Sequence, residues 1–259
     1  MSLLDDVLAS TRARVDEAKR VLTPDVLEQR IASAEAPRGF RAALAGEGTA
    51  IVAEVKRASP AAGPLDIDLD AAALARAYAR GGAAAISVLT EPRYFRGSLD
   101  DLAAARGAGV PVLLKDFVVD EFQVLEARAA GADAILVIVR VLERDDDLRA
   151  LVAAAGALRM DALVEVHDER DLERAAAAGA DLVGVNHRDL ATFEVDPART
   201  ARLAPHVAAG AVLVALSGVS SRADVERLAA AGAHAVLVGE SVVTAPDPGA
   251  KVAELAGRA

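Results

Sequence analysis

A weak internal repeat constrains the fold of this chain more than any other feature of its sequence. A glycine followed by small residues and an apolar run occurs at Gly81, Gly131, Gly179 and Gly232. Glycine often ends a helix because it adopts the left-handed conformation without steric cost. The apolar run that follows is typical of a strand buried on both faces. Each copy therefore predicts the end of a helix followed directly by a buried strand.

Four more apolar runs lie before and between these copies. They cover residues 50–55, 111–114, 162–166 and 211–215. Eight strands would then alternate with helices, and strict alternation indicates a parallel sheet. The length of 259 residues suits one closed barrel. The predicted fold class is therefore α/β, a (β/α)8 TIM barrel.

Amphipathic segments follow each predicted strand, and several begin with Ser or Asp as expected of a helix N-cap. We expect these helices over residues 70–80, 98–108, 120–130, 144–158, 168–178, 196–203, 221–231 and 248–255. The chain before the first strand has helical patterns over residues 3–21 and 25–34. We predict one domain, 1–259, with an N-terminal helical extension (1–48) that packs on the barrel (49–259).

The composition narrows the classes of site and partner. The net charge of −10 disfavours nucleic acid and anionic membranes as partners. The sequence has no Cys, which excludes disulfides, thiolate zinc sites and Cys nucleophiles. No His has a second ligand at metal spacing. We expect a cytoplasmic monomer without signal peptide, metal or cofactor, acting on a small molecule.

Polar residues gather where the predicted strands end, which is where such barrels carry their active sites. Glu54 and Lys56 are two residues apart on the first strand and point to the same side. Taken alone, they could be a structural ion pair. Other polar residues at the same barrel end favour acid–base machinery for an anionic substrate; these are Lys115, Glu165, Asn186 and Arg188.

Small residues in the loops after the seventh and eighth strands predict a phosphate site. These loops contain Ser217 and Gly218, and Gly239 and Glu240. Small residues expose backbone N–H groups near a helix start, which is where such barrels bind phosphate. The glycines could also be simple turn residues. The position of both loops at one barrel end favours phosphate binding.

An apolar wall is predicted beside these polar groups. Phe95, Phe117 and Leu136 lie at or near strand ends and could enclose a flat aromatic ring. The alternative is ordinary core packing. The chain has only five Phe, so two of them at the barrel mouth favour the ring site.

Several motifs, in order along residues 50–244, resemble the indole-3-glycerol-phosphate synthase family. They occupy residues 53–60, 87–91, 95–99, 115–119, 126–133, 163–167 and 183–190. The extension before the first strand resembles the family too. The resemblance implies conversion of 1-(2-carboxyphenylamino)-1-deoxyribulose 5-phosphate to indole-3-glycerol phosphate, carbon dioxide and water in tryptophan biosynthesis, with no cofactor or metal.

The resemblance also implies roles for the predicted site. Lys115 would be the general acid and Glu165 the general base, while Lys56 would hold the substrate carboxylate. Glu54 would orient Lys115, and Asn186 with Arg188 would hold sugar hydroxyls and orient Glu54. The residues assigned to catalysis are Glu54, Lys56, Lys115, Glu165, Asn186 and Ser217. Those assigned to substrate binding are Ser59, Phe95, Phe117, Leu136, Arg188, Leu216, Gly218, Gly239 and Glu240.

Three departures from the family pattern leave an alternative open. Leu216 stands where the family usually has Glu, Leu114 where it often has Arg, and residues 59–63 lack a loop Lys. We expect Leu216 to reduce turnover or shift the substrate preference. The alternative is a paralogue with altered preference, or a non-catalytic barrel that binds a phosphate ligand. Related barrels that need a catalytic Cys, paired Asp or a Schiff-base Lys late in the chain fit the strand ends less well.

Overall fold

The strands of the computed structural model form one closed parallel barrel; the model describes residues 3–189, 192 and 194–258. In chain order the barrel strands are β1 (Ala50–Val55), β4 (Ala85–Leu89), β5 (Val112–Lys115), β6 (Ala134–Ile138), β7 (Asp161–Val166), β8 (Leu182–Asn186), β9 (Val212–Leu216) and β10 (Ala235–Val238). Each strand pairs with the next in this order, and β10 pairs with β1 to close the ring. The predicted (β/α)8 barrel is confirmed.

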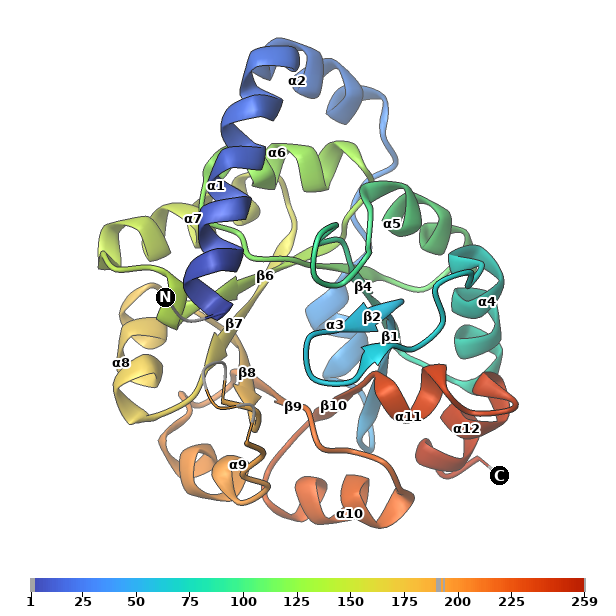
Figure 1. The fold of residues 1–259 in the computed structure, drawn as a ribbon. Coiled ribbons are helices and arrows are strands. Elements are labelled where there is room, and N and C mark those ends of the chain that lie inside the picture. The colour runs from blue at the N-terminus through green and yellow to red at the C-terminus, as the bar shows by residue number, and fades with distance from the viewer. Residues whose placement is uncertain (1–2, 190–191, 193, 259) are drawn as a thin grey trace.

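Helices surround the barrel and alternate with its strands (Figure 1). They are α4 (Ala71–Gly81), α5 (Leu99–Ala105), α6 (Glu121–Ala129), α7 (Asp145–Ala157), α8 (Glu169–Ala177), α9 (Arg199–Leu203), α10 (Arg222–Ala230) and α12 (Pro248–Leu255). Asp70, Ser98 and Asp168 cap three of them by accepting a hydrogen bond from the third helical N–H. These caps are why the helices begin where the sequence indicates.

The repeat glycines act as predicted, with one shift. Gly131, Gly179 and Gly232 have φ values of 95°, 82° and 99°, and each follows the Ala residue that caps the helix before it. In the first copy, Gly81 is the last helical residue and Gly82, with φ 96°, takes the left-handed position. The left-handed residue stops each helix and turns the chain into the next strand.

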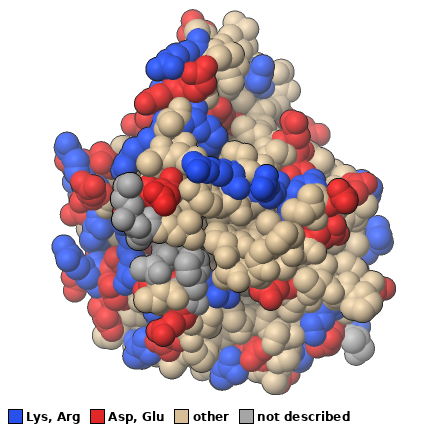
Figure 2. Space-filling model, viewed as in Figure 1, with Lys and Arg blue, Asp and Glu red and all other residues tan. Residues whose placement is uncertain are grey.

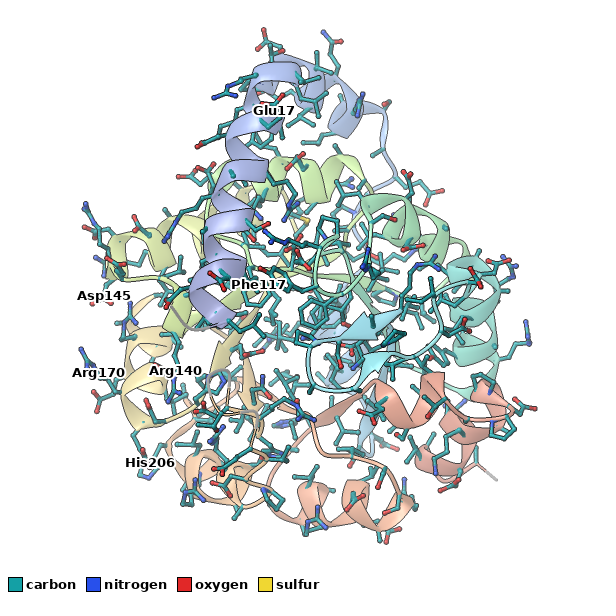
Figure 3. All side chains as sticks on the ribbon, viewed as in Figure 1. Glu17, Phe117, Arg140, Asp145, Arg170 and His206 are labelled. Atoms are coloured by element: carbon teal, nitrogen blue, oxygen red, sulfur yellow. The ribbon has the colours of Figure 1, made fainter. Side chains whose placement is uncertain are left out.

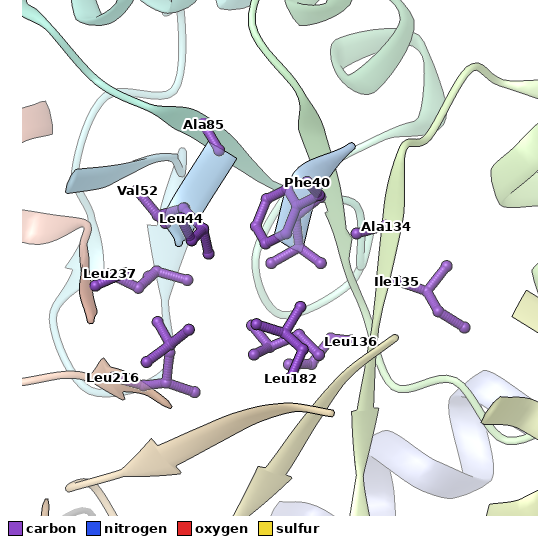
Figure 4. Packing of buried hydrophobic residues seen from close by; sticks show 14 of the residues in the cluster. Phe40, Leu44, Val52, Ala85, Ala134, Ile135, Leu136, Leu182, Leu216 and Leu237 are labelled. Atoms are coloured by element: carbon purple, nitrogen blue, oxygen red, sulfur yellow. The ribbon is translucent and has the colours of Figure 1, made fainter. Parts of the chain in front are cut away.

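The barrel core is aliphatic and is closed at the N-terminal ends of the strands by a short helix. This helix, α3 (Phe40–Leu44), contacts β1 and β4. Phe40 and Leu44 are fully buried, and Figure 4 shows them beside Val52 and Ala85. Because α3 fills this end, we look for the site at the opposite end, where the strands have their C-termini.

The N-terminal extension packs on the outside and over the mouth of the barrel. Helix α1 (Leu3–Val21) crosses in front of the strands in Figure 1, and α2 (Pro24–Ser33) packs against α6. Val15 and Leu27 bury their side chains with Phe122 of α6 in a small separate cluster. Arg14 of α1 donates to Asp116 Oδ2 at 2.8 Å, beside the end of β5. The extension thus reaches the same barrel end as the predicted site.

Some elements were not predicted. They are α3, a small antiparallel hairpin of β2 (Ala58–Ser59) and β3 (Gly63–Pro64), α11 (Glu240–Val243), and the 3-10 turns η2 (Val139–Val141) and η3 (Ala204–His206). The helix predicted over residues 98–108 consists of α5 and the 3-10 turn η1 (Arg106–Ala108). One predicted helix, 196–203, begins at Arg199 instead. Asp196 precedes Pro197, and a residue before proline avoids the helical conformation.

Within the described residues, no helix is both long and apolar enough to cross a membrane. Figure 2 shows Lys and Arg side chains near the centre of the face that carries the barrel mouth, although the chain as a whole is acidic. Leu190, the last residue of one family motif, lies outside the described residues.

Candidate active site

One cavity of about 440 Å³ opens at the C-terminal ends of the barrel strands. All the residues predicted for the site line it: Glu54, Lys56, Ser59, Phe95, Lys115, Phe117, Leu136, Glu165, Asn186, Arg188, Leu216, Ser217, Gly218, Gly239 and Glu240. Their strands are far apart in sequence, and barrel closure brings them together. In Figure 3 Phe117 lies over the centre of the barrel, whereas Asp145 and Arg170 lie at the rim.

Glu54 links the two lysines of the cavity. Its Oε1 lies 2.9 Å from Lys56 Nζ, and its Oε2 lies 3.8 Å from Lys115 Nζ. Burial alone would raise the pKa of Glu54, but the two ammonium groups outweigh it and lower that pKa below its usual range. Glu54 is therefore a carboxylate at neutral pH, and it holds two positive charges at the mouth of the barrel.

Gly239 leaves room for this arrangement. A Cβ built at Gly239 would overlap Glu54 Oε1 and would lie 2.9 Å from Lys56 Nζ. The loop after β10 thus contacts the Glu54–Lys56 pair directly through its backbone. Any side chain at this position must push the pair aside.

Replacing Gly239 with Ala should therefore impair the site without unfolding the barrel. We expect kcat/KM for the cavity's substrate to fall by about 10-fold to 100-fold, because misplacement of reacting groups by about 1 Å has effects of this size. Steady-state kinetics would measure it. Gly210→Ala is a surface control: no heavy atom lies within 4 Å of its Cβ position, although its φ of 83° also strains Ala. Equal losses in both variants would contradict the contact-based explanation.

On the other side of the cavity, a hydrogen-bonded chain joins three predicted residues. Asn186 Nδ2 donates to Glu165 Oε1 at 3.0 Å, and Ser217 Oγ donates to Asn186 Oδ1 at 2.9 Å. We expected Asn186 to orient Glu54, and that expectation is wrong: its amide donates to Glu165. β8 lies next to β7 in the barrel, whereas β1 is farther round the ring. Asn186 therefore positions Glu165 rather than the lysine pair.

An apolar surface separates the Lys115 side from the Glu165 side. Leu136 on β6 is buried and lines the cavity between β5 and β7. The rings of Phe95 and Phe117 lie 6.4 Å apart between centroids with their planes tilted by 42°. A flat ring that rests on these side chains would have Lys115 on one side and Glu165 on the other.

A buried carboxylate, which the sequence analysis did not single out, fixes Phe95. Glu91 follows β4 and accepts hydrogen bonds from the backbone N–H groups of Arg93, Tyr94 and Phe95. These bonds hold the turn that places Phe95 in the cavity. A carboxylate that satisfies three consecutive N–H groups is a structural support and needs no catalytic role.

Asp116 connects the extension to the site. Burial raises its pKa, and Arg14, the Phe117 N–H and the Thr90 hydroxyl offset only part of the rise. Arg14 and Thr90 contact Oδ2 at 2.8 and 3.1 Å, and the Phe117 N–H donates to Oδ1. Asp116 directly follows Lys115, so α1 is joined to the strand end that carries this lysine. No sequence pattern indicates this pairing, because Arg14 and Asp116 are far apart in the chain.

The loops after β9 and β10 line the side of the cavity next to β1. Ser217 and Gly218 have φ values of 70° and 77°, so two consecutive residues adopt the left-handed conformation. This conformation costs Ser about 1 kcal/mol, which indicates that its surroundings hold it in place. Asp224 closes the loop by accepting hydrogen bonds from the N–H groups of Ser220 and Ser221.

Asp224→Asn should destabilise the protein in a pH-dependent way. Partial burial would raise the pKa of Asp224, but hydrogen bonds from Ser220 and Ser221 and the contact with Arg227 lower it from 3.8 to about 2. A depressed pKa stabilises the fold above about pH 4 and ceases to do so as the pH falls to about 2. We expect Asn to lower the free energy of unfolding by about 1 kcal/mol at pH 7. Urea denaturation at pH 7 and pH 3 should show the difference shrinking at the lower pH; a constant difference would contradict this assignment.

No group of three or more His, Asp or Glu in the described part of the chain could hold a metal ion. Of the histidines, His167 and His187 are buried at strand ends. His167 lies between two carboxylates, with its Nε2 3.6 Å from Glu165 Oε1 and its Nδ1 3.7 Å from Asp171 Oδ2. The site therefore consists of lysines, carboxylates, amides and backbone, with an apolar floor.

Comparisons with known proteins agree with this geometry. A family model described as indole-3-glycerol phosphate synthase matches residues 4–255. The indole-3-glycerol phosphate synthase of Mycolicibacterium vanbaalenii is 49% identical over 255 residues, 98% of this chain and 93% of the relative. Indole-3-glycerol phosphate synthase 2 of Streptomyces coelicolor is 49% identical over 98% of this chain and 99% of the relative.

Solved structures with low identity share the fold. Thiamine phosphate pyrophosphorylase from Pyrococcus furiosus superposes with a TM-score of 0.60 at 17% identity, covering 80% of this chain and 93% of that one. A 3-hexulose-6-phosphate synthase superposes with a TM-score of 0.62 at 21% identity, covering 81% and 99%. At these identities the likeness concerns the barrel alone.

Proposed function

Since this chain belongs to the indole-3-glycerol phosphate synthase family, whose members are carboxy-lyases of tryptophan biosynthesis, we propose how its cavity performs the reaction. The substrate is 1-(2-carboxyphenylamino)-1-deoxyribulose 5-phosphate. The observation that carries the proposal is the convergence of Lys115, Glu54, Lys56 and Glu165 on one cavity, with an apolar floor between acid and base.

The substrate is proposed to lie across the barrel mouth. Its aromatic ring rests on Phe95, Phe117 and Leu136, and its phosphate reaches the loops after β9 and β10. Ser59, Gly218, Gly239 and Glu240 line that end of the cavity. Glycines at such loops let the backbone N–H groups approach a phosphate. Lys56, whose Nζ lies 2.9 Å from Glu54 Oε1, is proposed to hold the ring carboxylate.

Ring closure requires a proton on the ketone oxygen. The ring carbon that bears the carboxylate attacks the ketone carbon, and Lys115 donates a proton to the oxygen as it becomes a hydroxyl. The carboxylate then leaves as carbon dioxide, and its electron pair returns to the ring system. Glu54 Oε2 lies 3.8 Å from Lys115 Nζ, so the carboxylate holds the ammonium group at this side of the cavity.

Dehydration completes the indole. The new hydroxyl leaves as water after it receives a proton, for which Lys56 and Lys115 are both within the cavity. Glu165 removes a proton from the methylene carbon next to the amine nitrogen, so that the carbon–carbon double bond of the indole forms and the nitrogen keeps its hydrogen. Asn186 and Ser217 hold Glu165 in position through their hydrogen bonds. Arg188 contributes to binding the sugar hydroxyls.

Leu216 is the one observation that favours a second candidate, a barrel that binds the phosphate ligand with little or no turnover. Its side chain is buried at the cavity floor and contacts the position of Gly184, where a Cβ would lie 3.0 Å from Leu216 Cδ1. Leu offers no charge to balance a lysine. We propose a slowed synthase, because the acid, its partner carboxylate and the base are all present.

Leu216→Glu tests the two candidates directly. A carboxylate at this position adds a partner for the lysines, and we expect kcat to rise by about tenfold if Leu216 only slows the reaction. Leu216→Gln has the same shape without the charge and is the matched control. If substrate binds tightly to the parent protein but neither it nor Leu216→Glu forms product, the binding candidate is correct.

The remaining expectations concern partners and location. We propose that the protein is a monomer in the cytoplasm that acts without nucleic acid or membrane, because its acidic charge repels polyanions. Light scattering after size exclusion would give the oligomeric state: a mass near 26.6 kDa supports a monomer.

A further inference from the structure

His187 is buried directly behind the loop that follows β9, and the proposed mechanism does not use it. Its side chain is 1% exposed, and it is not among the residues that line the cavity. Its Nδ1 lies 3.0 Å from the Ser217 carbonyl oxygen, and its Nε2 lies 2.7 Å from Thr200 Oγ1. The ring thus bridges the ends of β8 and β9 and helix α9.

The two contacts fix the proton on one ring nitrogen. A carbonyl oxygen can only accept, so Nδ1 must donate to Ser217. Burial is the largest influence on the pKa of His187 and lowers it, and the charge of Arg199 lowers it as well. The Ser217 carbonyl and Asp196 act in the opposite direction, but the pKa of His187 remains lowered overall. In the neutral ring, Nε2 then accepts from the Thr200 hydroxyl. Both ring nitrogens are satisfied, and the ring cannot turn over without losing a bond.

The Ser217 carbonyl determines where the next N–H points. In a trans peptide the carbonyl and the following N–H point in opposite directions, and no described peptide bond is cis. Because His187 holds the carbonyl from behind the cavity, the Gly218 N–H is directed away from His187, toward the cavity that Gly218 lines. The left-handed φ values of Ser217 and Gly218 are the backbone cost of this orientation.

We infer that His187 is a positioning residue for the phosphate end of the substrate: by holding the Ser217 carbonyl, it keeps the Gly218 N–H aimed at the phosphate. If the Ser217–Gly218 peptide turned over, a carbonyl oxygen would face the phosphate instead of an N–H. The inference rests on the proposed phosphate site but does not depend on turnover.

Two substitutions separate the contacts of the ring. The side-chain nitrogen of Asn takes nearly the position of His Nδ1, and that of Gln nearly the position of Nε2. His187→Asn can therefore still hold Ser217, whereas His187→Gln can hold only Thr200. We expect His187→Gln to raise KM and the Kd of inorganic phosphate about tenfold to 100-fold, since one donor to a charged group is lost. Its kcat should change less than about threefold, and His187→Asn should stay near the parent in all three quantities.

Three further variants control the experiment. Thr200→Val removes the other contact and should leave the phosphate Kd nearly unchanged. His206→Gln changes an exposed histidine at the rim, seen in Figure 3, and should have no effect. If His187→Gln fails to fold, His187→Leu, which also lacks the donor, replaces it and should show the same loss.

Calorimetric titration with inorganic phosphate distinguishes the outcomes. Weaker phosphate binding in His187→Gln but not in His187→Asn supports the inference, even if the parent protein forms no product. Equal changes in the two variants, or an unchanged phosphate Kd in folded His187→Gln, would overturn it. Loss of kcat with unchanged phosphate Kd would overturn it as well, because His187 would then act on the chemical step.

Discussion

Lys115→Met is expected to lower kcat for indole-3-glycerol phosphate formation by about 10²–10⁴-fold, the range in which a general acid contributes. Met has a similar length but no proton to donate. Lys115 Nζ is the more distant of the two ammonium groups around Glu54, at 3.8 Å against 2.9 Å for Lys56. Glu54 therefore keeps its closer partner, and the fold should remain intact. Fluorescence detection of the indole product would measure the loss.

The effect must be separated from a loss of binding. Titration of Lys115→Met with substrate should give a Kd within about tenfold of the parent KM, because ring and phosphate contacts remain. The matched control is Lys251→Met, at a helix surface where Lys251 pairs with Glu254; its kcat should not change. Lys115→Met with more than about a tenth of the parental kcat would show that another group donates the proton.

Glu54→Gln is expected to affect both activity and stability. The neutral amide removes the negative charge that separates the ammonium groups of Lys56 and Lys115. The change is made at a buried position, since Glu54 is 4% exposed. Removal of one member of a buried ion pair costs up to about 3–5 kcal/mol. The lysines remain partly exposed at the cavity, so we expect about 2 kcal/mol in urea denaturation at pH 7. We also expect kcat/KM to fall at least about 100-fold.

The pH dependence follows from the depressed pKa of Glu54. A carboxylate with a lowered pKa stabilises the fold above its usual range and stops doing so as the pH falls through its folded value. The difference in stability between parent and Glu54→Gln should therefore be full at pH 7 and smaller in acid. The double variant Glu54→Gln with Lys56→Met removes one of the two charges and should recover part of the stability. If the double variant is less stable than Glu54→Gln alone, charge repulsion is not the cause.

The sequence predicted the barrel because its signals are local and repeated. Four of the eight strands are short apolar runs after a helix-ending glycine, and the other four are apolar runs of similar length. Helices α1 and α12 begin and end where the pattern indicates. Helix α3 was missed because five residues are too few for a visible period. The β2–β3 hairpin was missed because each of its strands has only two residues.

The positions of the site residues were predictable because parallel strands bring their C-terminal ends to one edge. The partners within the site were less predictable. Asn186 was expected beside Glu54 but donates to Glu165, since neighbouring strands decide which side chains meet. The pairing of Arg14 with Asp116 and the support of Ser217 by His187 join distant segments. Such contacts depend on how helices and loops pack, which hydrophobic periodicity does not encode.

The central claim is that this cavity closes an indole ring, and an assay of the unmodified protein tests it most directly. Purified protein is mixed with 1-(2-carboxyphenylamino)-1-deoxyribulose 5-phosphate, and the increase in indole fluorescence is followed with time. We predict saturable formation of indole-3-glycerol phosphate that disappears in Lys115→Met. No product from a folded parent protein that binds the substrate would contradict the account, and the barrel would then be a binding protein or an enzyme for another substrate.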